Sequence, residues 1–167
     1  MNKTDKIKTE VRDKKSEIIV RQHRHWTRWI EAGRTMGEGN LVLTNRRLLF
    51  LHRIQASPDV SASIKSLADA PMETVLNHAL TLHKNCFQIP LPSIIRVRIG
   101  AFVRFPFPYF YLNVSYYEGK KQTPHTAAFQ FIRSKSEVLF HPQIIADLGW
   151  MIATRRAIQE TGQLKTR

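Results

Sequence analysis

The chain has 167 residues, 43% of them hydrophobic, a single cysteine and a formal net charge of +13 at pH 7. This length supports one main hydrophobic core, and a single cysteine excludes an intrachain disulfide, so the sequence predicts one globular domain in a reducing, cytosolic setting. The N-terminal residues lack the apolar segment of a signal peptide, and no run of about 18 uncharged apolar residues occurs, so we expect neither export by a standard signal nor a membrane-spanning segment.

The positive charge is concentrated in the C-terminal half. Residues 74–167 hold 12 Lys and Arg residues against 4 Asp and Glu residues, and no carboxylate side chain occurs between Glu73 and Glu118. A folded domain with this balance attracts phosphate-rich partners, either nucleic acid or an anionic lipid surface. The sign of the charge does not choose between the two.

The N-terminal region divides into a tail and an extended segment. Residues 1–15 alternate charges with few apolar side chains, which predicts a flexible basic tail. Residues 18–30 are rich in β-branched and aromatic side chains and are expected to be extended. Gly33 and the cluster Gly37-Glu38-Gly39 then interrupt it, and the cluster indicates a turn between strands. We place a single domain at residues 16–160, followed by a short tail at 161–167.

Residues 39–50 predict a β-hairpin. The apolar positions of its two strands alternate with a period of two: Leu41, Leu43, Leu48 and Phe50. Thr44-Asn45 provides turn residues between them. The order Gly, apolar pair, Leu-Thr-Asn, Arg and Leu-apolar-Phe resembles the second and third strands of GRAM domains and of related bacterial pleckstrin-homology-like (PH-like) domains.

This resemblance implies an α+β fold and a binding role. The fold is a bent antiparallel sheet of roughly seven strands, a split barrel, capped by a C-terminal amphipathic helix. The segment Phe87-Gln88-Ile89-Pro90-Leu91 is similar to the short strand that leads into the next strand of the family. Such domains commonly dock on membranes or on proteins.

A minimal PH-like domain does not need residues 54–84, and their spacing predicts a helical insertion between the third and fourth strands. Pro58-Asp59 begins one short helical stretch that runs through Ala68. Pro71 suits the first position of a second helix. Its apolar residues follow at helical spacing: Val75, Leu76, Ala79, Leu80 and Leu82. This helix either covers the core or presents a partner-binding face.

The next segments alternate strands and turns. Residues 85–91 resume a strand, and Arg96-Val97-Arg98-Ile99 places two arginines on one face and two aliphatic side chains on the other. Residues 118–120 form a turn, and residues 126–132 return as a strand. Between them, residues 109–117 predict an apolar face of Phe110, Leu112, Val114 and Tyr116.

The period changes near Ser136. Apolar residues then recur every three or four positions, which predicts an amphipathic helix that begins near His141-Pro142. Arg155 and Arg156 lie near its far end, where cations complement the helix dipole. The expected core-facing stripe consists of Val138, Ile144, Ile145, Leu148, Met151 and Ile152.

Residues 102–110 combine four phenylalanines with prolines at alternate positions, Pro106 and Pro108. Because proline cannot donate to a strand ladder, we expect a stiff loop here rather than paired strands. Its aromatic side chains either contact a membrane or a partner, or seal the barrel mouth or a dimer contact. The residues of this candidate membrane-contact or partner loop are Phe105, Phe107 and Tyr109.

The candidate lipid- or anion-binding residues are Arg46, Arg47, Arg96, Arg98, Arg104, Lys120 and Lys121. In lipid-binding PH domains, basic side chains near the opening of the sheet grip headgroup phosphates, usually through a Lys-x-Lys/Arg pattern between the first two strands. The corresponding region here, residues 30–40, has Arg34 as its only cation. This departure argues against specific phosphoinositide recognition. The arginine after Leu-Thr-Asn has an alternative, structural role in turn hydrogen bonds.

No residue pattern is typical of an enzyme or of a metal site. His23 and His25 have no ligand-forming neighbours, and His78 and His83 are five residues apart, which does not suit one helix face. Cys86 is typical of a buried strand thiol rather than a nucleophile. We therefore expect neither catalysis, nor a metal, nor a cofactor.

The sequence thus favours a non-enzymatic binding module, cytoplasmic and peripheral to the membrane. It would associate with anionic lipid or a partner protein through its basic face and aromatic loop. The alternative is a nucleic-acid-binding protein, in which tyrosines on a strand face stack bases beside the basic surface. Those tyrosines are Tyr109, Tyr111 and Tyr117.

Overall fold

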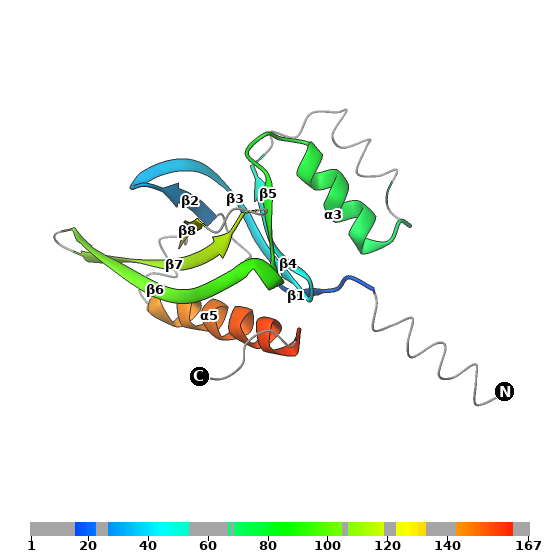
Figure 1. Cartoon of the computed structure of the whole chain (residues 1–167). Coiled ribbons are helices and arrows are strands. Elements are labelled where there is room, and N and C mark those ends of the chain that lie inside the picture. The colour runs from blue at the N-terminus through cyan, green and yellow to red at the C-terminus, as the bar shows by residue number, and fades with distance from the viewer. Residues whose placement is uncertain are drawn as a thin grey trace.

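A computed structural model describes residues 16–22, 27–53, 67, 69–104, 107–118, 123–132 and 143–161, with the backbone alone for 102–104, 107–109 and 143–147. In these residues eight strands form one antiparallel sheet (Figure 1). The strands are β1 (Ile19–Gln22), β2 (Thr27–Glu31), β3 (Arg34–Thr44), β4 (Arg47–His52), β5 (Phe87–Pro90), β6 (Ile94–Arg104), β7 (Phe107–Tyr117) and β8 (Pro124–Phe131). The helices are α3 (Met72–Thr81), α5 (Gln143–Glu160) and the short 3-10 helix η1 (Leu91–Ser93).

The strand order across the sheet is β5-β4-β3-β2-β8-β7-β6, and β1 pairs separately with β3. The sheet bends so that its two halves enclose a common core. Phe50 of β4 and Phe87 of β5 both approach Phe129 of β8, with ring centroids 6.1 and 6.2 Å apart. Leu112 and Val114 of β7 are fully buried in the same cluster, as the predicted alternation requires.

The hairpin predicted at residues 39–50 is confirmed as β3 and β4. Leu43 pairs with Leu48 and Leu41 with Phe50, and all four side chains are buried in the core. Asn45-Arg46 forms the turn between the strands.

The turn predicted at Gly37-Glu38-Gly39 is wrong, because this segment lies inside β3 and pairs with β2. The chain turns instead at Ala32 and Gly33, whose φ angles of 47° and 77° suit a two-residue hairpin turn. Gly39 is required for another reason. A β-carbon at this position would lie 2.1 Å from the carbonyl oxygen of Leu51, so only glycine lets β3 and β4 approach each other here.

A helical insertion between the third and fourth strands is not present among the described residues. β3 and β4 are joined directly, and α3 follows β4. The predicted strand numbering is one too low, because the extended N-terminal segment contains two strands, β1 and β2, rather than one. The helical stretch predicted from Pro58 falls mostly outside the described residues.

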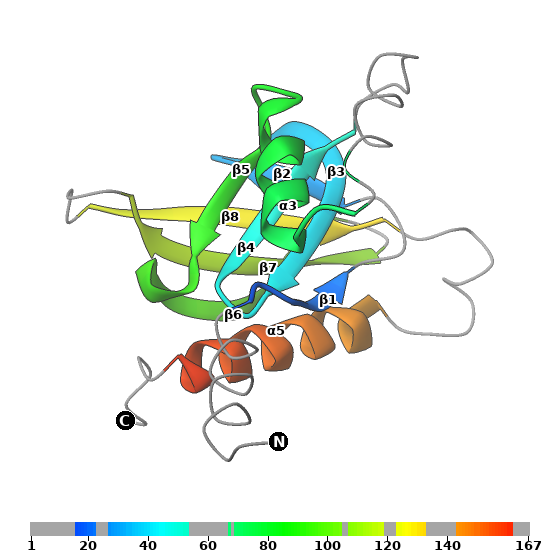
Figure 2. The same cartoon turned by 90° about the vertical axis from the view of Figure 1, so that its right-hand side faces the viewer.

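α3 covers the outer face of β3 and β4 (Figure 2). Leu76 is buried against Val42 and Leu49, and Leu51 and Leu80 border this second cluster. The hairpin is therefore apolar on both faces, which explains why its sequence is nearly continuous in aliphatic residues. Of the two predicted roles for the helix, covering the sheet is the one its contacts support.

α5 packs against β6, β7 and β8 (Figure 1), and the predicted stripe on it is partly wrong. Leu148 and Ile152 are 38% and 61% exposed. The helix instead buries Trp150, whose ring stacks on Phe131 at 5.5 Å, because the largest apolar side chain gains most from leaving water. Its other buried residues are Thr154, Ala157 and Ile158. Val138 lies outside the described residues, as do the side chains of Ile144 and Ile145.

The loop predicted at residues 102–110 is also wrong, because β6 and β7 pair as far as Arg104 and Phe107. β8 pairs with β7 only from Leu112 onward. The pairs from Gly100↔Tyr111 to Arg104↔Phe107 therefore form a two-stranded projection, the β6–β7 ribbon, visible at the left of Figure 1. Pro108 is tolerated there because one side of β7 has no partner strand in the described part of the chain.

None of the helices in the described residues has the length and apolar character needed to cross a bilayer.

Candidate functional site

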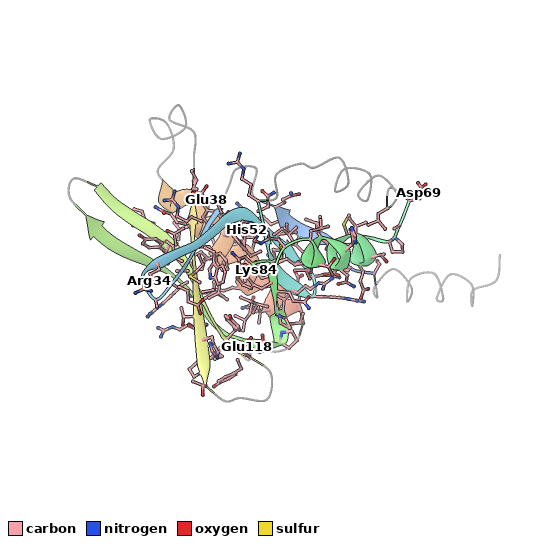
Figure 3. The ribbon with its side chains drawn as sticks, turned by 90° about the horizontal axis from the view of Figure 1, so that it is seen from above. Arg34, Glu38, His52, Asp69, Lys84 and Glu118 are labelled. Carbon is pink, nitrogen blue, oxygen red and sulfur yellow. The ribbon has the colours of Figure 1, made fainter. Side chains whose placement is uncertain are left out.

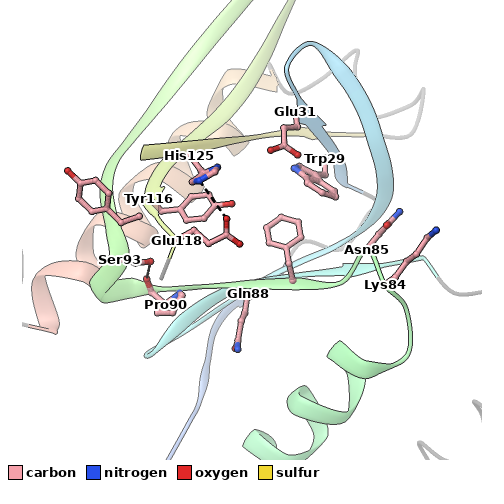
Figure 4. A pocket seen from close by; sticks show the side chains of 12 residues that line it. Trp29, Glu31, Lys84, Asn85, Gln88, Pro90, Ser93, Tyr116, Glu118 and His125 are labelled. Carbon is pink, nitrogen blue, oxygen red and sulfur yellow. Dashed lines mark hydrogen bonds and ion pairs between the residues drawn. The ribbon is translucent and has the colours of Figure 1, made fainter. Parts of the chain in front are cut away.

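A cavity of about 660 Å³ opens between the end of β2, the start of β5 and the paired ends of β7 and β8 (Figure 4). We call it the Trp29 cavity. Its volume lies within the range of roughly 300 to 1,000 Å³ that is typical of small-molecule sites. Its lining residues are Trp29, Glu31, Lys84, Asn85, Phe87, Gln88, Pro90, Ser93, Tyr116, Tyr117, Glu118 and His125.

The cavity continues the core face beyond the point where the aliphatic side chains end. Trp29 pairs with the buried Phe129, and Glu31 lies two residues further along the same face of β2. On β7 the buried face that contains Val114 continues to Tyr116, which pairs with His125 of β8. Strand alternation thus directs these side chains toward one space.

Two groups of aromatic rings form the walls of the Trp29 cavity. On one side the rings of Trp29 and Phe87 lie 4.6 Å apart at 53°, and on the other those of Tyr116 and His125 lie 6.0 Å apart at 34°. The indole Nε1 of Trp29 is buried and donates to no acceptor among the described residues. An aromatic enclosure of this kind suits the apolar part of a ligand or the face-on approach of a cation.

The ionisable groups of the cavity carry more negative than positive charge. Among the described residues that line it, Glu31 and Glu118 are opposed by Lys84, while Nε2 of His125 lies 3.6 Å from a carboxylate oxygen of Glu118 and is charged only when protonated. Burial, with the carboxylates of Glu118 and Glu31 nearby, raises the pKa of the Tyr116 phenol. The cavity is therefore a locally acidic space in a strongly basic protein.

The predicted site residue Arg47 lies in a largely buried ion pair. Its Nε and Nη2 atoms donate to the two carboxylate oxygens of Glu17 at 2.8 and 2.7 Å, and the side chains are 12% and 1% exposed. Nη1 of Arg47 also donates to Gln88. The Thr44 hydroxyl lies 2.8 Å from the same Glu17 carboxylate and accepts from the backbone N–H of Arg47. Hydrogen bonds to Arg47 and Thr44 lower the pKa of Glu17, although its burial acts in the opposite direction.

The turn between β3 and β4 holds the segment that precedes β1. The side chain of Asn45 donates to the carbonyl of Ser16 and accepts from the N–H of Ile18, at 3.0 and 3.1 Å. Arg46, another predicted site residue, donates to Glu73 of α3 at 2.9 Å. The Thr-Asn-Arg-Arg sequence therefore links three parts of the fold. In this arrangement its arginines bind carboxylates of the protein itself.

Arg96 and Arg98 lie side by side on the outer face of β6, which is the last strand of the sheet. Both are exposed, and neither forms an ion pair or a hydrogen bond with another described side chain. Their register partners Ser115 and Asn113 place them on the same face of the sheet as Tyr111. Arg104, Phe107 and Tyr109 lie further along, in the β6–β7 ribbon, with only their backbone described.

The remaining predicted site residues, Phe105, Lys120 and Lys121, lie outside the described residues. The structure thus places the described members of the predicted basic set on two elements: Arg46 and Arg47 at the β3–β4 turn, and Arg96, Arg98 and Arg104 on β6. Figure 3 shows the sheet from above, with Arg34 of the β2–β3 turn to the left and Asp69, before α3, to the right.

Sequence reasoning did not identify the Trp29 cavity. Its lining comes from four segments: β2, residues 84–93 around β5, the end of β7 and the start of β8. The β7–β8 hairpin agrees with the predicted turn at residues 118–120, but the sequence pattern does not reveal that β2 pairs with β8 or that β5 lies beside them. One signal was available. Tyr116 was predicted on the same face as Leu112 and Val114, so its position at the end of the buried face of β7 followed from alternation.

Histidine and cysteine residues of the described segments form no group of three or more potential metal ligands. His83 stacks on His52 with ring centroids 3.9 Å apart, and burial, then the charges of His52 and Lys84, lower the pKa of His83. Sγ of Cys86 accepts the backbone N–H of His52 at 3.2 Å, and burial raises the pKa of the thiol. A raised pKa lowers the thiolate fraction, which is the opposite of nucleophile activation.

No protein-family model matches the sequence, and no curated protein matches it. Among solved structures, the chain is similar to one described as the Vps36 N-terminal PH domain. The TM-score is 0.48 at 12% sequence identity, and the match covers 87% of this chain and 81% of that chain.

Proposed function

We propose that this chain is a non-enzymatic, PH-like binding module that attaches reversibly to anionic membranes. The attachment surface consists of the outer face of β6 and the adjacent β6–β7 ribbon. The observation that carries this proposal is the pair Arg96 and Arg98, two adjacent exposed guanidinium groups with no carboxylate partner in the described part of the chain.

The sequence around this pair lacks the negative charge that would oppose a lipid headgroup. No Asp or Glu residue occurs from 74 to 117, so β5, β6 and β7 carry no carboxylate side chain. Each arginine near an anionic leaflet contributes about 1 kcal/mol to membrane attachment. Arg96 and Arg98 together would supply about 2 kcal/mol, which corresponds to roughly thirtyfold in affinity.

The β6–β7 ribbon supports the same surface through its composition. Residues 102–109 contain apolar and aromatic side chains with Arg104 among them, and an isolated two-stranded ribbon is only marginally stable in water. Contact with the interfacial region of a bilayer would remove phenylalanine side chains from water, at about 1.5 to 3 kcal/mol for each one fully transferred. Cations beside apolar side chains are the combination that peripheral attachment uses.

Vesicle sedimentation tests the proposal. The full chain should pellet with phosphatidylserine-containing vesicles and much less with phosphatidylcholine vesicles, and binding should weaken as salt is added. The double variant Arg96→Gln with Arg98→Gln should lose roughly thirtyfold in affinity. A matched control, Arg53→Gln with Arg156→Gln, removes the same charge from other exposed positions and should retain most of the binding.

Several outcomes would reject membrane attachment through this face. They are equal pelleting with neutral and anionic vesicles, no pelleting with either, or equal losses in the double variant and its control. In the last case net charge, rather than a localised site, would drive the association. Arginines on an edge strand also hinder pairing with other sheets, and that role alone predicts unchanged vesicle binding in the variant.

One observation favours nucleic acid as a second candidate. Tyr111 and Tyr117 lie on the same face of β7 as the register partners of Arg96 and Arg98, so rings and cations share a surface that could stack and hold a single strand. A gel shift with single-stranded RNA at low salt tests this function. No shift under those conditions rejects it, because phosphate contacts are strongest there.

A further inference from the structure

We propose that the Trp29 cavity binds an organic ammonium ion, primary or quaternary. This site is separate from the outer face of β6, and the inference does not depend on membrane attachment through Arg96 and Arg98. It also differs from the headgroup-phosphate recognition that the PH-like resemblance implies.

The aromatic walls and the volume of the Trp29 cavity suit an organic ammonium ion. Trp29 and Phe87 line one side and Tyr116 lines the other, around a space of about 660 Å³ (Figure 4). An alkylammonium group is attracted to the face of an aromatic ring by the ring quadrupole, and more strongly when it is desolvated. The cavity has room for such a group together with the carbon chain that carries it.

The described ionisable residues of the Trp29 cavity carry the negative charge that a bound cation requires. Glu31 is half-buried and makes no ion pair with another described residue, and Nε2 of His125, at 3.6 Å, is the one described ion-pair partner of Glu118. Lys84, the single ammonium in the lining, lies on the far side of the cavity from Glu118 in Figure 4. A bound cation would supply a positive charge to these two carboxylates, which have no Lys or Arg ion-pair partner among the described residues.

The phenol of Tyr116 is affected by the negative charges of Glu31 and Glu118. Its pKa is raised by burial and then by the negative charges of Glu118 and Glu31, so both carboxylates act on one point of the cavity. A phosphate placed there would be repelled by both, and Lys84 is the one Lys or Arg among the described lining residues that would attract it. The lining therefore favours a positively charged ligand over the anion expected from the net charge of the chain.

Titration of the isotope-labelled full chain with choline chloride and with butylammonium chloride tests this assignment by NMR. Sodium chloride at equal ionic strength is the reference, and inorganic phosphate is the anionic probe. The indole N–H signal of Trp29 and the backbone signals of Tyr116 and His125 should shift with the ammonium salts and remain unchanged with the other two.

Variants of the lining give opposite expected effects. Glu118→Gln should weaken ammonium binding about fourfold and Glu31→Gln about tenfold. Both estimates take the ammonium to lie roughly 5 Å from the carboxylate, with water-like screening at Glu118 and weaker screening at the half-buried Glu31. Lys84→Gln should strengthen binding, which no purely structural role predicts. Glu160→Gln on α5 removes the same charge as the first two variants from an exposed position outside the cavity and should leave binding unchanged.

Thermal unfolding of each variant verifies that it is folded before its affinity is compared. Shifts caused by phosphate at the cavity residues would overturn the assignment, as would equal affinities for choline in Glu31→Gln and the unaltered chain. Binding to phosphatidylcholine vesicles that is lost in Glu31→Gln would support the assignment and identify a lipid headgroup as the source of the ammonium. Choline binding without vesicle binding would support a free amine.

Discussion

Replacing Arg47 by methionine should destabilise the protein strongly at neutral pH. The guanidinium makes two hydrogen bonds to the carboxylate of Glu17, which is 1% exposed. Methionine fills much of the same space but leaves this carboxylate buried without its charged partner. Breaking a buried ion pair from one side costs about 3 to 5 kcal/mol, because the remaining charge has lost both water and its counter-ion.

The loss can be measured by thermal unfolding. For a domain of 150 to 250 residues, 1 kcal/mol corresponds to about 2 to 4 °C in the unfolding midpoint, so Arg47→Met should lower that midpoint by roughly 6 to 20 °C. Arg46→Met is the matched control. Its partner Glu73 is 49% exposed and can return to water, so the expected loss is no more than about 1 kcal/mol.

The pH dependence gives the sign of the effect. The pKa of Glu17 is lowered in the folded protein, so the stability that its charge contributes is present above the pKa of the unfolded chain and is lost as the pH falls through the folded value. Without Arg47, burial is the largest remaining influence and acts to raise this pKa. The carboxyl of the variant should then become neutral at a higher pH, so the difference in stability between the two proteins should shrink on acidification.

Two results would refute this reasoning. One is a midpoint for Arg47→Met within about 3 °C of the unaltered protein at pH 7, equivalent to roughly 1 kcal/mol. The other is a difference that stays constant as the pH is lowered. The double variant Glu17→Gln with Arg47→Met should recover part of the loss, because it no longer buries an uncompensated charge.

Three further outcomes are expected from other contacts. Gly39→Ala should cost about 2 to 4 kcal/mol in thermal unfolding, since its β-carbon would overlap the Leu51 carbonyl, whereas Gly33→Asn, with open space around it, should cost about 1 kcal/mol or less. Trp29→Phe should cost no more than about 1 kcal/mol, because the indole N–H has no hydrogen bond to a described residue, and a larger loss would reveal an unrecognised acceptor. Cys86 should react with a disulfide reagent at pH 8 at least roughly tenfold more slowly in the folded chain than in urea, and equal rates would contradict its burial and raised pKa.

The parts of the fold that the sequence predicted depend on local alternation. Leu41 and Leu43 lie on one face of a strand whatever the rest of the chain does, and their burial follows once that face meets a core. Leu112 and Val114 behave in the same way. Where one face of a strand is buried and the other is polar, alternation with a period of two decides which side chains face the core.

The parts that the sequence did not predict depend on choices made by tertiary contacts. α5 carries apolar side chains around much of its circumference, so periodicity alone could not select the face of Trp150 over that of Ile152. At Pro108 the local rule against strands was overridden, because the outer end of β7 pairs on only one side. The Trp29 cavity depends on long-range pairing between β2 and β8, for which a single sequence carries no local signal.

The cover that α3 provides for the β3–β4 hairpin ties the fate of one segment to that of the other. Val42 and Leu49 avoid solvent only while the helix stays docked. A cut or deletion within residues 54–84 that released the helix would expose the outer apolar face of the β3–β4 hairpin. An exposed apolar face of this kind promotes self-association. Sequence changes in residues 54–84 are therefore limited by aggregation of the protein as much as by its folding stability.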